Sequence, residues 1–114
     1  MSQSYEDWRE ERLEAARQHA AELAAAVARR ANLENVKHAV VAMAQIDAER
    51  QGFHTVSAQA REAHSSDEYR EWCEAHAAAV EEAERLRLEW RVIEMEFEYW
   101  RTTRADRRAE MQMT

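Results

Sequence analysis

The sequence contains no proline and a single glycine, Gly52. Globular proteins average roughly 5% proline and 7% glycine. Hairpins, dinucleotide-binding folds and phosphate-binding loops need these residues at their turns. Their scarcity therefore excludes all three classes. The abundant residues are alanine, glutamate and arginine, which are strong helix formers, so the composition predicts an all-α fold.

Cysteine and long apolar runs are scarce as well. The one cysteine, Cys73, cannot form a disulfide within the chain, so the composition does not point to an oxidising compartment. No apolar run approaches the roughly 20 residues that a membrane-spanning helix needs. The first residues are acidic, unlike a signal or transit peptide. We therefore expect a cytoplasmic protein with no membrane partner.

The chain has 114 residues, a length that suits a single domain with a thin core. Its charge is distributed unevenly along the sequence. The net charge is −7; residues 66–99 hold eleven acids and four arginines, whereas residues 100–114 hold four arginines and two acids. Phosphate contacts need a basic face, so nucleic acid is not expected as the main ligand. An acidic body suits a basic protein surface, although it also simply favours solubility.

The first arm, residues 4–51, opens with Ser4, whose side chain is placed to accept from the Asp7 amide. Apolar residues then recur three and four positions apart, namely Leu13, Ala16, Ala20, Leu23 and Val27. Beyond Asn32 the phase changes, and the set becomes Leu33, Val36, Val40 and Met43. We predict a break or kink near Asn32; the alternative is one helix that buries opposite faces in its two halves.

A connector, residues 52–65, follows Gly52, the best helix C-cap in the chain. Thr55 or Ser57 can begin a short helix within it. Ser65 and Glu68 form a capping box for a long helix over residues 66–108. Apolar residues alternate three and four apart along that helix and define what we call the seam: Tyr69, Trp72, His76, Ala79, Ala83, Leu86, Trp90, Ile93, Phe97 and Trp100.

Two arms of similar length joined by a connector predict an antiparallel helical hairpin or a three-helix bundle with long coiled-coil-like helices. The pairing would place Trp8 near Trp100.

The long helix also carries a second stripe, about 140° around the helix from the seam. Its members are Leu88, Val92, Met95 and Tyr99. A hairpin covers only one of these faces. Three alternatives account for the other: the first arm folded back as two helices, a homodimer, or another protein. An uncovered stripe of this size would mark an interaction site.

Chemical sites are sparse in the sequence. No glutamate stands three residues before a histidine, as di-iron helical bundles require. Cys73 and His76 share a helix face but lack two further zinc ligands, and His76 is more simply a hydrogen-bonded core histidine. The many glutamates of the long helix are more simply a solvated face than paired catalytic acids. We expect no catalytic residue, no metal and no cofactor.

Four arginines form a basic tip near the C-terminus: Arg101, Arg104, Arg107 and Arg108. Cations at a helix C-terminus complement the helix dipole. The functional alternative is a contact with phosphate or an acidic protein, with Trp100 beside it for stacking.

The tail has a recognisable order of residues: Trp90, Glu94 and Glu98 precede Trp100-Arg101-Thr102 and Arg104-Ala105, and Arg108-Ala109-Glu110-Met111 follows. With Tyr69, Trp72 and His76 upstream, this part of the chain resembles small helical proteins encoded by phages and prophages. The resemblance implies a phage accessory protein in the host cytoplasm. Many small acidic phage proteins block host nucleic-acid machinery, anti-CRISPR proteins among them.

These observations predict a non-enzymatic protein–protein interaction module, such as a phage inhibitor of a host nucleic-acid-targeting complex, which acts through acidic helix faces. The alternative is a recombination accessory protein that contacts nucleic acid or a recombinase through its arginine tip. The predicted partner-binding residues are Leu88, Val92, Met95, Tyr99, Glu89, Glu96, Trp100, Arg101, Arg104 and Arg108.

Overall fold

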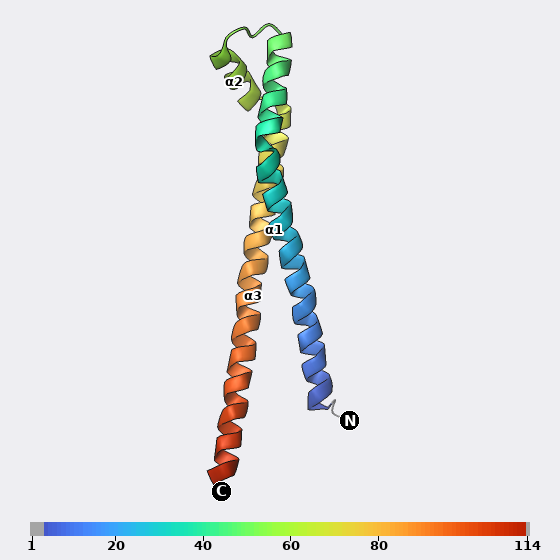
Figure 1. The fold of residues 1–114 in the computed structure, drawn as a ribbon, viewed down its shortest axis with the longest axis vertical. Coiled ribbons are helices and arrows are strands. Elements are labelled where there is room, and N and C mark those ends of the chain that lie inside the picture. The colour runs from blue at the N-terminus through green and yellow to red at the C-terminus, as the bar shows by residue number, and fades with distance from the viewer. Residues whose placement is uncertain (1–3, 114) are drawn as a thin grey trace. The chain divides into compact units, whose positions relative to one another are not determined.

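The computed structural model describes residues 4–113 and contains three helices, with no strand in that range (Figure 1). They are α1 (Tyr5–Arg50), α2 (Val56–His64) and α3 (Asp67–Met113). The predicted all-α fold is confirmed. The chain divides into two compact units. Unit 1 joins the residues up to Leu23 to those from Glu84 onward, and unit 2 is Ala24–Ala83.

The start of α1 is capped by Ser4, as predicted. The Asp7 amide donates to Ser4 Oγ at 3.2 Å, and the Trp8 amide donates to the Ser4 carbonyl at 3.1 Å. Glu6 and Asp7 lie in the first turn, where negative charge complements the helix dipole.

The predicted break near Asn32 is wrong, because α1 is continuous from Tyr5 to Arg50. Two successive steps of three residues, Ala20 to Leu23 to Ala26, shift the inward-facing positions without interrupting the helix. Ala26 is only 2% exposed. The buried or half-buried positions of α1 beyond it are Arg30, Leu33, Val40, Val41, Ala44, Gln45 and Ala48.

Three residues that we had placed on the inward-facing stripes of α1 instead point outward. Val27 is 39% exposed, Val36 is 46% exposed and Met43 is 68% exposed. The sequence pattern was misleading here because alanines, which are common throughout the helix, take the buried positions Ala44 and Ala48.

Gly52 ends α1 as predicted, with a φ of +105° that glycine adopts readily. The Gly52 amide donates to the Glu49 carbonyl and the Phe53 amide donates to the Ala48 carbonyl, both at 3.1 Å. This pair of bonds is the Schellman pattern of helix termination.

The connector holds α2, which begins after the N-cap Thr55, one of the two predicted starts. Its Oγ1 accepts from the Ala58 amide at 3.1 Å. The predicted cap of α3 is displaced by one residue. Ser66 Oγ accepts from the Tyr69 amide at 3.2 Å, whereas Ser65 Oγ donates to the Arg61 carbonyl at the end of α2. Ser65 lies too close to the last turn of α2 to begin the next helix.

In unit 2, α1 and α3 run antiparallel and meet mainly through small side chains. Trp72 Nε1 donates to the Leu33 carbonyl at 2.8 Å, and Arg29 pairs with Glu82 at 2.6 Å. The buried core of this unit is made of alanines: Ala26, Ala44, Ala48, Ala63, Ala79 and Ala83. Small residues let the helix backbones approach closely, so the core is thin.

His76 packs in this unit by stacking and not by the hydrogen bond that we expected. Its ring lies parallel to Trp72, with centroids 4.9 Å apart. Nε2 is 3.5 Å from a Glu34 carboxylate oxygen, beyond hydrogen-bond length, and has no hydrogen-bond partner among the described residues.

Candidate protein-binding surface

In unit 1, α1 and α3 also run antiparallel, and polar pairs join them. His19 Nε2 lies 3.0 Å from a Glu89 carboxylate oxygen, and Arg12 pairs with Glu96. The seam residues of this unit, which include Leu86 and Ile93, are buried or half-buried. The second stripe lies on α3 outside this contact.

Aromatic rings from both helices gather near the beginning of α1. Trp8 and Trp100 lie 5.4 Å apart by ring centroid in an edge-to-face arrangement, as the antiparallel pairing predicted. Tyr5 is 5.4 Å from Trp100, and Phe97 is 6.2 Å from it. We call these four residues the aromatic cluster. It is incompletely covered, because Tyr5 is 40% exposed and Trp8 is 42% exposed.

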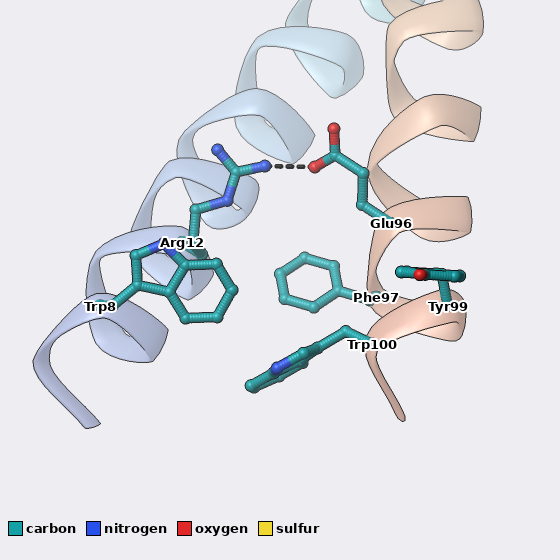
Figure 2. A pocket seen from close by; sticks show the side chains of 6 residues that line it. All are labelled: Trp8, Arg12, Glu96, Phe97, Tyr99 and Trp100. Atoms are coloured by element: carbon teal, nitrogen blue, oxygen red, sulfur yellow. Dashed lines mark hydrogen bonds and ion pairs between the residues drawn. The ribbon is translucent and has the colours of Figure 1, made fainter. Parts of the chain in front are cut away.

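The aromatic cluster borders an open pocket of about 440 Å³, which we call the aromatic pocket (Figure 2). Trp8 and Phe97 face each other across it, and the Arg12–Glu96 ion pair closes one side. The six lining residues are Trp8, Arg12, Glu96, Phe97, Tyr99 and Trp100. The two charged groups pair with each other, and the rest of the lining is aromatic, so the pocket is suited to an apolar or aromatic side chain.

The second stripe is exposed along its whole length. Leu88 is 59%, Val92 55%, Met95 69% and Tyr99 76% exposed. Tyr99 also lines the aromatic pocket. Tyr99 is therefore shared by the stripe and the pocket, which adjoin on unit 1.

The two acids that we had included in the binding surface are engaged within the chain. Glu89 lies beside His19 and accepts from Arg85 Nη1 at 2.9 Å. The hydrogen bond from His19, and then that from Arg85, lowers the pKa of Glu89 below its usual 4.5. Glu96 is held by Arg12. Both acids fasten α1 to α3 at the edge of the stripe.

The arginine tip is only partly available for a partner. Arg101 donates to Glu98 at 2.8 Å, and the Arg104 guanidinium sits 4.5 Å over the Tyr5 ring. Arg108 is exposed at the end of α3. The structure therefore brings Trp100, Arg104 and Tyr5 together and leaves Arg108 apart from them.

Groups suited to metal binding are not assembled in the described part of the chain. Between residues 4 and 113, no three His, Cys, Asp or Glu side chains are close enough to hold a metal ion. Cys73 lies beside Tyr69 and, through a side-chain hydrogen bond, raises the pKa of that phenol above its usual 10.0. No helix in this range is long and apolar enough to cross a membrane.

Comparison with known proteins gave no match, whether to a protein-family model, to a curated protein or to a solved structure. The candidate surface therefore stands on its geometry. Sequence analysis found the second stripe and the Trp8–Trp100 contact. It did not predict that Tyr5 and Phe97 belong to a partly exposed aromatic cluster. The spacing of Phe97 predicts a core residue and does not show that α1 leaves the cluster partly uncovered.

Proposed function

We propose that this protein is a non-enzymatic protein–protein interaction module that binds its partner through the second stripe and the aromatic pocket of unit 1. The fold proposed for the module is an antiparallel helical hairpin on long coiled-coil-like helices, with α2 as a third helix. The antiparallel pairing of α1 and α3 within each unit supports that arrangement.

The observation that carries the proposal is the exposure of the stripe. Four large apolar side chains in succession are 55–76% exposed over a length of roughly 17 Å. Burying a side chain of this size contributes about 1.5–3 kcal/mol. Contiguous apolar patches on small proteins commonly mark interaction sites, and the aromatic pocket next to the stripe provides a place for an anchoring side chain.

The partner that fits this surface is a basic protein. The chain carries a net charge of −7. Glu94 and Glu98 lie beside Met95 of the stripe, together with the single base Arg91. Such a field speeds association with a positively charged surface. The resemblance of the tail to small phage proteins directs this proposal to a host nucleic-acid-targeting complex in the cytoplasm, which the protein would inhibit in the manner of an anti-CRISPR protein.

Affinity capture from lysate of the source host tests this proposal. Wild type should retain a protein partner, and Met95→Glu should reduce the recovered partner at least tenfold, because a charge is buried in an apolar contact. Met43→Glu is the matched control, since Met43 lies in unit 2 and is 68% exposed against 69% for Met95. Equal recovery with all three proteins, or no partner for wild type, would contradict the proposal.

The alternative function, a nucleic-acid or recombinase accessory, is supported by the proximity of Arg104, Tyr5 and Trp100. Stacking platforms beside arginines are typical of single-strand binding. It requires binding to single-stranded DNA that weakens steeply with salt and falls in the Arg104→Ala/Arg108→Ala variant. Salt-independent or unchanged binding would exclude it.

A further inference from the structure

The outward side of α1 in unit 2 carries a helix face without a single charged residue. We call it the uncharged face; its members are Ala25, Ala28, Asn32, Asn35, Val36, Ala39, Ala42, Met43 and Ile46, all of them exposed. It extends roughly 32 Å along the helix. In a chain whose residues are 34% charged, a face of this length without charge is unusual.

The charges of this segment are turned away from the face. Residues 25–46 contain four charged residues, Arg29, Arg30, Glu34 and Lys37, and Arg29 lies at the edge of the face. Glu34 lies 3.5 Å from His76 of α3, and the Lys37 ammonium sits 5.4 Å from the centre of the Trp72 ring. Glu34 and Lys37 therefore lie on the side that meets α3, and Arg29, at the edge of the face, pairs with Glu82 of α3.

The uncharged face is also uneven in height. At one end, Met43 is 68% exposed and Ile46 is 50% exposed. The other end is a shallow hollow of about 520 Å³, lined by Ala25, Ala28, Arg29, Asn32, Leu33 and Val36. A bulky end and a hollow end on the same face make it self-complementary under a two-fold rotation.

We propose that the occupant of the uncharged face is a second copy of this chain, docked antiparallel, so that Met43 and Ile46 of each copy enter the hollow of the other. Such an interface is isologous and closes with two copies. The hollow is centred near residue 30 and the bulky end near residue 45, which places the two-fold axis near residue 37.

Charge favours a second copy here over a basic partner. Two chains of net charge −7 repel one another, and only a neutral face lets them approach without placing acids opposite acids. A basic partner would instead be drawn to the acidic surfaces.

The edge of the face adds a specific match. In the antiparallel register, Arg29 of one copy lies opposite Asp47 of the other. The two-fold axis repeats this pair, so the interface contains two of them. Asp47 is held only loosely in its own helix, 3.9 Å from Arg50. Arg29 uses Nη1 for Glu82 and, with five N–H donors, can serve a second carboxylate.

Solution mass by light scattering tests the proposal. Wild type and Met95→Glu should show twice the single-chain mass of 13.4 kDa, and Met43→Glu should show the single-chain mass. Met43 is largely exposed, so its replacement should leave the helices formed, which far-UV circular dichroism verifies. The measurement is made at about 100 μM, where even a Kd of roughly 10 μM gives mostly dimer. A single-chain mass for wild type at this concentration would overturn the proposal. A Met43→Glu variant that still shows twice the single-chain mass would overturn it as well.

Orientation is tested by cross-linking in a Cys73→Ser background with a short bis-maleimide. Ala39→Cys lies close to the two-fold axis and should cross-link to its counterpart. Ile46→Cys should not, because its counterpart would lie about 25 Å away along the axis. Cross-linking at both positions would mean that the two helices are parallel. Cross-linking at neither position would mean that the dimer forms through a different interface. Either result overturns the antiparallel docking.

The two Met→Glu variants also separate this proposal from the proposed function. Both proposals are supported if Met43→Glu loses the dimer but still captures the partner, and Met95→Glu loses partner capture but still forms the dimer. A monomeric wild type that still captures a partner would refute the dimer and leave the proposed function standing.

Discussion

At the scale of single residues, the contacts of Glu89 couple stability to pH. Its pKa is lowered below 4.5 in the folded chain because His19 and Arg85 stabilise the carboxylate. A carboxylate with a depressed folded pKa contributes stability that is fully present above its unfolded pKa and is lost as pH falls through the folded value.

We therefore expect Glu89→Gln to melt at a lower temperature than wild type at about pH 7, and the difference to be smaller at about pH 3, because the carboxylate stabilisation is lost as the pH falls below 4.5. Thermal melts at the two pH values measure it. Glu71→Gln, an exposed glutamate of unit 2, serves as the control. A difference that stays the same or grows towards acid would contradict the role assigned to Glu89.

Trp100 is the ring that contacts the other three members of the aromatic cluster. Its centroid lies 5.4 Å from both Tyr5 and Trp8 and 6.2 Å from Phe97. Trp100→Ala should lower the free energy of unfolding by about 2–3 kcal/mol, measured by urea denaturation, and should reduce the near-UV circular dichroism signal. Tyr99→Ala, at a 76% exposed neighbour, should cost less than about 0.5 kcal/mol.

At the scale of elements, helix ends are decided by single hydrogen bonds. The N-cap of α3 is Ser66, whose Oγ accepts from the Tyr69 amide, while Ser65 donates to carbonyls at the end of α2. Ser66→Ala should destabilise the chain by about 1 kcal/mol. Ser65→Ala should cost less, because carbonyl groups at a helix end are readily hydrated. The reverse order in urea denaturation would favour the capping box originally predicted at Ser65.

The two long helices differ in how much of their packing could be predicted. All ten seam residues of α3 are buried or half-buried, because large side chains such as Trp90 and Phe97 mark that face clearly. In α1 the buried positions beyond Leu23 are mostly alanines, which also occupy exposed positions. The pattern of large residues therefore pointed to Val27, Val36 and Met43, which lie outside.

At the scale of the whole molecule, the dimer proposed through the uncharged face links stability to concentration. A folded state stabilised by association melts at a higher temperature when the protein is more concentrated. Wild type should lose several degrees on hundredfold dilution, and Met43→Glu should melt at one temperature throughout. Differential scanning fluorimetry over this range measures the effect. A wild-type midpoint that does not change would count against a dimer of the folded chain.

The sequence by itself determined that the chain is helical, where its helices are capped within one residue, and that α3 has two apolar sides. Composition, cap residues and spacing act within a few residues along the chain, so their effects can be predicted without knowing which residues pack against them. Only the tertiary structure decided which positions of α1 turn inward, because alanine fits both a tight helix contact and a solvated surface. It also showed that the uncharged face and the half-open aromatic cluster are left uncovered, since exposure depends on what the partner helix reaches.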